Sequence, residues 1–174
     1  MTGRYNSCVV LELRRIRADD EAEVRAAQEA MEADNYPFAF SFDQFPIWAD
    51  HLARLDALSR GAVDGSVRED LLVADVEGVI VGRVSIRYDL DDFLAHEGGH
   101  IGYCVLPMHR RRGYATEMLR QSVELMQADG VERILITCDD HNVASARVIE
   151  RNGGVYESTV DSRNGVLKRR YWIE

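Results

Sequence analysis

The chain has 174 residues, of which 46% are hydrophobic and 29% are charged, and its formal net charge is -9. A chain of this size and composition can bury one hydrophobic core without a disulfide or a metal, so we expect a single domain over residues 1–174. The negative charge argues against a nucleic acid as partner, because affinity for a phosphate backbone comes from clustered Lys and Arg.

The first third of the chain predicts a strand followed by two amphipathic helices. Residues 8–13 form an apolar run typical of a strand. Asp19 or Asp20 can then cap a helix, because apolar residues recur after them at intervals of three and four. An aromatic-rich loop over residues 35–42 follows, and Asp43 can start a second helix. The apolar positions are Val24, Ala27 and Met31 in the first helix and Trp48, Leu52, Leu55 and Leu58 in the second, which has Pro46 in its first turn.

Two β-rich runs come next, over residues 71–76 and 79–87. They are joined by Glu77 and Gly78, a two-residue connection that predicts a tight antiparallel hairpin. The polar, acidic segment 89–99 follows, and we expect it to be a loop.

The second half of the chain alternates strands with helices. A strand over residues 100–105 ends before Pro107, and the clearest helix of the chain runs from Gly113 to Gly130. The apolar face of this helix consists of Ala115, Met118, Leu119, Ser122, Val123 and Met126. The remaining elements are a strand over 134–138, a helix from Asn142 to Arg151 that Gly153 and Gly154 end, and a hairpin of strands 155–160 and 166–173 around Asn164 and Gly165. Hairpin links outnumber helix crossovers, so we predict an α/β fold with a mixed, largely antiparallel sheet.

The three cysteines, Cys8, Cys104 and Cys138, lie in separate apolar runs, where a small hydrophobic residue would also fit. We interpret them as reduced thiols. The sequence shows neither a signal-peptide pattern nor an apolar stretch of the ~20 residues that a membrane span needs. We therefore expect a soluble, cytoplasmic protein with no membrane partner.

The segment from Val105 to Ala115 carries the strongest functional signal. A strand ends at Pro107, three arginines follow, and Gly113 and Ala115 keep large side chains away from the start of the long helix. Unpaired N–H groups and the positive end of a helix dipole suit a diphosphate. The alternative interpretation is a basic surface turn with a small-residue cap.

Arg110, Gly113 and Ala115 occupy the three fixed positions of the coenzyme A signature of the GNAT superfamily, so the chain resembles these acyl-CoA N-acyltransferases. A second shared feature is Asn142, which follows the next strand and starts a helix that ends at Gly153. Over residues 71 to 173, the expected order of strands and helices is that of the superfamily. The first third of the chain matches only in having a strand and two helices. It implies a central sheet flanked by helices, with two parallel strands splayed apart at the cofactor cleft.

The resemblance also implies acetyl-CoA as acyl donor, no metal, and a defined set of binding residues. The pantetheine arm would pair with the strand and the diphosphate with the helix start. Asn142 and Ser145 would line the far end of the arm, although both also fit a simple helix cap. The implied residues are Tyr103, Cys104, Val105, Arg110, Arg111, Arg112, Gly113, Tyr114, Ala115, Thr116, Asn142 and Ser145.

The implied reaction is direct transfer of the acyl group to a primary amine in a ternary complex, but the usual acid and base are missing. The position of the family's general-base Glu is occupied here by Gly99. Glu97 and His100 are the candidates to replace it, and the alternative is that both lie in an exposed loop without a catalytic role. The family's general-acid Tyr falls on Ile149. The substitutes are Tyr103, Tyr156 and Tyr171, for which core packing is the alternative role.

Two other functions stay open. A coenzyme A-binding module without catalysis would also lack the usual acid and base. Residues His96 to His100 match the H-E-x-x-H zinc pattern, but two adjacent glycines disfavour the helix that this chemistry needs. The acceptor is a small molecule or a peptide with an amine, and the sequence does not define it further. The oligomeric state also stays open, with a homodimer as one alternative.

Overall fold

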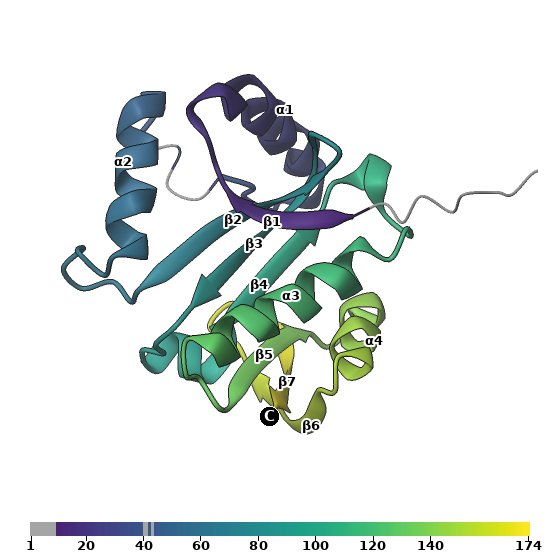
Figure 1. Cartoon of the computed structure of the whole chain (residues 1–174). Coiled ribbons are helices and arrows are strands. Elements are labelled where there is room, and N and C mark those ends of the chain that lie inside the picture. Colours follow the sequence, from purple (N-terminus) through teal and green to yellow (C-terminus); the bar gives the residue numbers. More distant parts are fainter. Residues whose placement is uncertain (1–9, 40–41, 43) are drawn as a thin grey trace, which may run out of the picture.

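A computed structural model describes residues 10–39, 42 and 44–174, which form two antiparallel sheets and four α-helices (Figure 1). The larger sheet has the order β1-β2-β3-β4, with β1 (Leu11–Arg15), β2 (Glu69–Val76), β3 (Val79–Arg87) and β4 (Ile101–Val105). The smaller sheet has the order β5-β7-β6, with β5 (Ile134–Asp139), β6 (Val155–Asp161) and β7 (Leu167–Ile173). The helices are α1 (Glu21–Met31), α2 (Trp48–Ser59), α3 (Tyr114–Ala128) and α4 (Val143–Arg151). The predicted α/β class, with largely antiparallel sheets flanked by helices, is confirmed.

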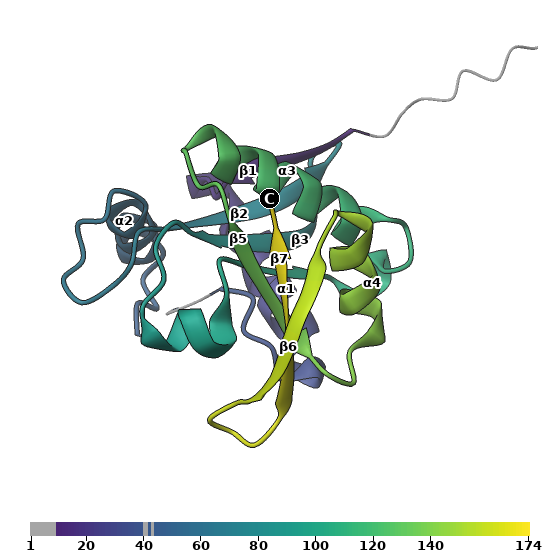
Figure 2. The ribbon, with the colours of Figure 1, turned by 90° about the horizontal axis from the view of Figure 1, so that it is seen from below.

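Helices cover both faces of the larger sheet (Figures 1 and 2). On one face, Met118 and Leu119 of α3 pack in one core with Val84 and Ile86 of β3. The opposite face carries a second core, built from side chains of α1, α2 and the sheet: Val24, Ala27, Met31, Trp48, Val73, Ile80 and Cys104. We refer to these two sides of the sheet as the α3 face and the α1 face. In the described part of the chain, no helix has both the length and the apolar character needed to cross a membrane.

The strongest local signals are confirmed. Glu77 and Gly78 have φ values of 54° and 83°, so both adopt the left-handed conformation that a tight two-residue hairpin requires. The long helix α3 begins at Tyr114, and Gly130 follows its end with a φ of 92°. Its predicted apolar face is buried at Met118, Leu119, Ser122, Val123 and Met126.

Several boundaries differ from the expectation. The first strand is described over Leu11–Arg15, and Cys8 lies outside the described residues. Asp43 also lies outside them, and α2 begins at Trp48, after Pro46 rather than before it. The segment 89–99 is not only a loop, because Leu94–Gly98 forms a π-helical turn.

Candidate functional site

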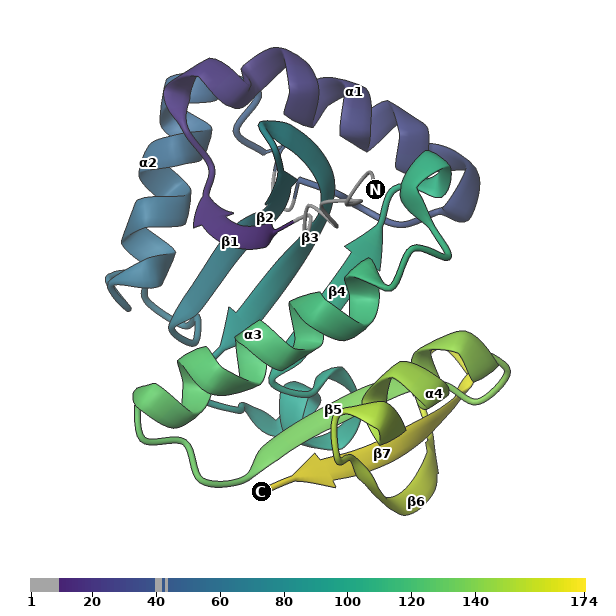
Figure 3. The ribbon, with the colours of Figure 1, turned by 45° about the vertical axis from the view of Figure 1, so that its right-hand side comes forward.

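Strands β4 and β5 are neighbours that belong to different sheets. They touch just before β4, where the His100 N–H donates to the Leu135 carbonyl and the Leu135 N–H donates to His100 Nδ1, both at 2.8 Å. Beyond this contact β4 pairs with β3, and β5 pairs with β7. Figure 3 shows the two strands diverging toward their C-terminal ends. Among the described residues, the edge of β4 that is turned toward β5 is therefore an unpaired sheet edge.

The hydrogen bonds to β3 determine which residues present their backbone to this edge. The Leu106 N–H donates to the Val81 carbonyl at 2.9 Å, and the Arg87 N–H donates to the His100 carbonyl at 2.8 Å. Because bonding direction alternates along an antiparallel strand, every second residue of β4 turns its N–H and C=O away from β3. These residues are Ile101, Tyr103 and Val105.

Cys104 lies between two of these residues and behaves differently. It is paired with Arg83 of β3, so its backbone is turned away from the unpaired edge. Its side chain is buried in the core on the α1 face, and burial raises the pKa of the thiol. Of Tyr103, Cys104 and Val105, which the resemblance implied as binding residues, only Tyr103 and Val105 thus present their backbone to the unpaired edge.

Gly99 marks the closest approach of the two strands. It has a φ of 69°, and a Cβ atom on it would lie 2.9 Å from the Leu135 carbonyl oxygen and 3.3 Å from the Thr137 nitrogen. A larger residue would therefore suffer both backbone strain and a clash with backbone atoms. The backbone at this position therefore has no room for the glutamate of the family pattern.

The start of α3 is open and uncapped. No side chain caps the helix at Gly113, which has a φ of 84°, and a Cβ atom placed there would meet nothing within 4 Å. Arg111 and Arg112 beside it are exposed. An open helix N-terminus with adjacent cations offers N–H groups and positive charge to an anion.

Arg110 has a different orientation from its two neighbours. Its guanidinium forms an ion pair with Asp34, beyond the end of α1, and its Nε donates to the Val105 carbonyl at 3.1 Å. The side chain therefore ties the turn after β4 to α1 and engages one of the backbone groups on the unpaired edge.

The start of α4 lies across from β4. Asn142 Oδ1 accepts a hydrogen bond from the Ser145 N–H at 3.0 Å, which confirms Asn142 as the N-cap. Ser145 Oγ lies 2.7 Å from the Tyr103 hydroxyl, so α4 and β4 are linked by their side chains. Burial raises the pKa of the Tyr103 phenol, which keeps it protonated at neutral pH. This contact has no local sequence signal, because the two residues are 42 positions apart.

Glu97 is buried, with 7% of its surface exposed, and it lies in the π-helical turn rather than on an extension of β4. The strand begins at Ile101, so Glu97 does not lie on a face of β4. The Glu97 carboxylate accepts the Arg163 N–H at 3.2 and 3.3 Å, and the Arg163 guanidinium lies 3.6 Å away. Glu97 therefore holds the loop between β6 and β7.

His100 is also buried, and its Nδ1 accepts the Leu135 N–H. Burial lowers its pKa, so the imidazole stays neutral with its proton on Nε2. His96 is exposed, and its Nε2 lies 2.9 Å from the Asp161 carbonyl. The two histidines of the zinc pattern thus have different surroundings. In the described ranges, no three His, Cys, Asp or Glu side chains are grouped as metal ligands.

The other positions considered for the general acid do not lie on the unpaired edge of β4. Ile149, at the family's tyrosine position, is fully buried in the core. The Tyr171 hydroxyl donates to Glu150 at 3.5 Å, and the exposed Tyr156 bonds to Thr159. Tyr103 is therefore the candidate acid on the unpaired edge itself.

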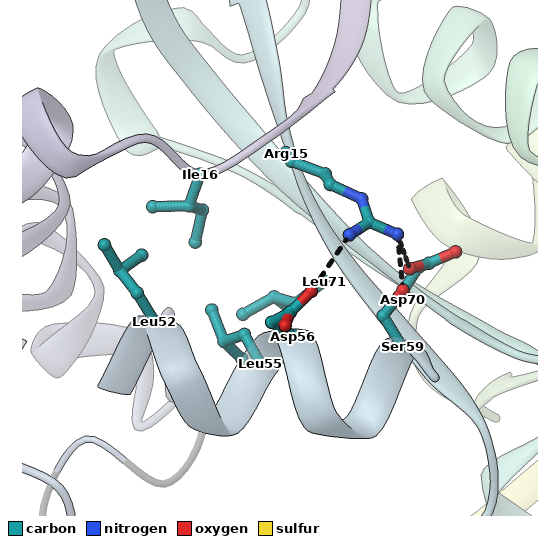
Figure 4. A pocket seen from close by; sticks show the side chains of 8 residues that line it. All are labelled: Arg15, Ile16, Leu52, Leu55, Asp56, Ser59, Asp70 and Leu71. Atoms are coloured by element: carbon teal, nitrogen blue, oxygen red, sulfur yellow. Dashed lines mark hydrogen bonds and ion pairs between the residues drawn. The ribbon is translucent and has the colours of Figure 1, made fainter. Parts of the chain in front are cut away.

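A separate pocket of about 240 Å³ lies between α2 and the ends of β1 and β2 (Figure 4). Figure 4 shows Arg15 reaching across it to Asp56 and Asp70, at 3.6 and 3.5 Å, above an apolar wall. No residue of the predicted site lines this pocket, so we do not assign it to the same site.

Comparisons with known proteins identify the family and the fold. A family model described as an acetyltransferase (GNAT) domain matches residues 11–155. No curated protein sequence matches the chain. Among solved structures, the chain is similar to Mycobacterium smegmatis RimJ in complex with CoA-disulfide, with 21% identity, a TM-score of 0.74, and 95% of this chain and 82% of that one covered. It is similar to the ribosomal-protein-S5-alanine acetyltransferase of Vibrio fischeri, with 19% identity, a TM-score of 0.72, and coverage of 94% and 92%. A third is the microcin C7 self-immunity acetyltransferase MccE with acetyl-CoA and AMP, with 16% identity, a TM-score of 0.69, and coverage of 94% and 91%.

Proposed function

The chain belongs to the GNAT acetyltransferase family, and from this premise we propose that it transfers an acetyl group from acetyl-CoA directly to a primary amine in a ternary complex. The observation that carries the proposal is the open, uncapped start of α3 at Gly113, next to exposed Arg111 and Arg112. The bound CoA-disulfide of RimJ and acetyl-CoA of MccE support the same donor for this chain.

In this proposal the donor binds along the unpaired edge of β4 and ends at α3. The backbone of Tyr103 and Val105 pairs with the pantetheine arm, and Ser145 and Asn142 border the arm from α4. The diphosphate is held by N–H groups at the turn and helix start, from Arg111, Arg112, Gly113, Tyr114 and Ala115. Thr116, which the sequence also suggested, donates its N–H to the Gly113 carbonyl at 3.0 Å instead. No metal takes part.

The chemistry needs two proton transfers. The amine nitrogen attacks the thioester carbonyl carbon, the C–S bond breaks, the amine gives up a proton and the thiolate takes one. Glu97 is the proposed base, because its carboxylate keeps free lone pairs beside the hydrogen bond from Arg163. His100, the second candidate, has none free in this arrangement, since its Nδ1 accepts the Leu135 N–H and its Nε2 carries the proton. Tyr103 is the proposed acid, because its phenol stays protonated and it lies on the edge where the arm binds.

The acceptor is a small molecule or a peptide with a free amine. The name of the similar Vibrio fischeri enzyme supports an acceptor of the amino acid or peptide kind. Cys104 and Cys138 are free and buried thiols, which supports a reducing, cytoplasmic location.

The test is a thiol-release assay on the purified protein with acetyl-CoA and a panel of amines, with mass spectrometry of the product. We expect acetyl-CoA to raise the melting temperature and at least one amine to release thiol and gain one acetyl group. Stabilisation by acetyl-CoA without thiol release from any amine would instead identify a coenzyme A-binding module that lacks catalysis.

A further inference from the structure

An ion pair joins the turn between β4 and α3 to the end of α1 (Figure 3). Arg110, in the turn, pairs through its guanidinium with Asp34, the last residue of a short 3₁₀ turn that follows α1. The same guanidinium donates to the Val105 carbonyl at 3.1 Å and lies 3.8 Å from the sulfur of Met31, a buried residue of α1. Groups from β4 and from the end of α1 therefore fix the Arg110 side chain. We call this contact the Arg110–Asp34 pair.

Each partner of the pair directly precedes a residue in the left-handed backbone conformation. Asn35 has a φ of 50°, and Arg111 has a φ of 63°. Among the described residues other than glycine, only Glu77 in the hairpin between β2 and β3 also has a positive φ. This conformation is costly for a residue with a Cβ atom, and Arg lacks the short polar side chain that makes it tolerable for Asn. Contacts beside Arg111 must therefore hold its backbone in place.

The left-handed backbone at Arg111 shapes the proposed diphosphate site. A second left-handed residue, Gly113, follows two positions later with a φ of 84°, and α3 starts directly after it. Turns of this kind direct successive N–H groups toward one point, where they can bind an anion. A relaxed backbone at Arg111 would turn these N–H groups apart, so the affinity for a diphosphate depends on what holds the turn.

The Arg110–Asp34 pair contributes little to the stability of the whole fold. The side chains of Arg110 and Asp34 are 44% and 38% exposed, and ion pairs at such positions add little to the free energy of unfolding. The pair does, however, fix the residue directly before Arg111. Its effect therefore falls on the conformation of the turn.

We propose that Asp34 is a positioning residue for donor binding, which acts through Arg110 to hold the turn before α3 in the left-handed form that receives the diphosphate. In this role Arg110 is not itself a phosphate ligand. The inference rests on the donor site of the acetyltransferase function proposed above, and it adds to that site a residue 76 positions before Arg110.

Three variants test the pair. Asp34→Asn removes one charge and keeps the size of the side chain, and Arg110→Gln removes the other charge. The double variant shows whether both side chains act through one contact. Asp129→Asn is the matched control, because Asp129 is 39% exposed and pairs with Arg68 at the other end of α3. We expect similar melting temperatures for all four variants.

The first probe is coenzyme A, whose binding is measured by calorimetry in the absence of turnover. We expect both single variants and the double variant to bind it about tenfold more weakly than wild type, and Asp129→Asn to bind it like wild type. The second probe is S-acetylpantetheine, which lacks the diphosphate, and its affinity is measured by NMR titration. We expect this affinity to be equal in all five proteins, whereas a general packing defect would weaken both probes.

Three results would overturn the role of Asp34. The first is an affinity of Asp34→Asn for coenzyme A equal to that of wild type. The second is tighter binding by this variant, which would mean that Asp34 keeps Arg110 away from the diphosphate. The third is a double variant whose loss is the sum of the two single losses in free energy, which would mean that Arg110 binds the diphosphate directly.

Thiol release with a panel of amines tests the acetyltransferase function separately. If coenzyme A binding shows the expected losses but wild type turns over no amine, the role of Asp34 is supported and the acetyltransferase function is refuted. If wild type turns over an amine but all variants bind coenzyme A equally, the acetyltransferase function stands and the role of Asp34 is refuted.

Discussion

The Tyr103 hydroxyl lies 2.7 Å from Ser145 Oγ, which joins β4 to the first turn of α4 where the two sheets separate. The hydrogen bond orients a phenol whose pKa is raised by burial. It places a proton donor on the strand edge that we propose for the pantetheine arm.

Tyr103→Phe should therefore impair turnover more than binding. We expect kcat to fall about a hundredfold, because the leaving thiolate loses its positioned acid, while the Kd for acetyl-CoA changes little. Steady-state kinetics and calorimetry measure the two quantities. Ser145→Ala is the control, since it removes the partner and keeps the phenol, and kcat should fall far less. If both variants have the kcat of wild type, Tyr103 is not the general acid and only packs in the core.

Glu97→Gln separates a catalytic from a structural role of the buried carboxylate. Gln keeps an oxygen that can accept the Arg163 N–H, so we expect the melting temperature to change little. An amide cannot take a proton from the amine, so kcat/KM should fall about a hundredfold. A variant with wild-type kcat/KM and a lower melting temperature would show that Glu97 only anchors the loop before β7.

His51 should make the protein less stable in acid. Its imidazole is fully buried, stacks on Trp48 with ring centroids 5.5 Å apart, and has no hydrogen-bond partner in the described residues. Burial, and then the charge of Arg25, lower its pKa. The unfolded chain therefore takes up the proton first, and stability is lost as the pH falls below about 6.5.

Urea unfolding at pH 7.5 and 5.5 measures this effect. Between these two pH values, the unfolding free energy should decrease less in His51→Phe than in wild type. The difference between the two decreases should reach up to about 1.4 kcal/mol for each pH unit below 6.5. His141→Gln, which removes an exposed imidazole, serves as the control and should behave like wild type. The same pH dependence in His51→Phe and wild type would contradict the assignment.

Elements with a local signal could be predicted from the sequence. The buried apolar face of α3 follows from the helical spacing of its apolar residues. The turn at Glu77 and Gly78 follows from the two-residue link between two β-rich runs, and the helix cap follows from the side chain of Asn142. Gly113 and Ala115 of the coenzyme A signature lie at the open helix start, whereas Arg110 turns to Asp34 and the Val105 carbonyl.

Features that depend on contacts between distant segments could not be predicted. Glu97 lies in a π-helical turn, and its carboxylate accepts the N–H of Arg163, 66 positions away. The close approach of Gly99 to the second sheet depends on Leu135, 36 positions away. No local pattern encodes such pairings.

The central claim is that the start of α3 binds a diphosphate, and the affinity of Gly113→Glu for acetyl-CoA tests it most directly. Gly113→Asn is the control. Asn tolerates the left-handed backbone conformation of Gly113 and adds a side chain without a charge. We predict that the Glu variant binds at least about a hundredfold more weakly than the Asn variant at a similar melting temperature, since a carboxylate there repels the phosphates. Equal affinity of the two variants would contradict the account.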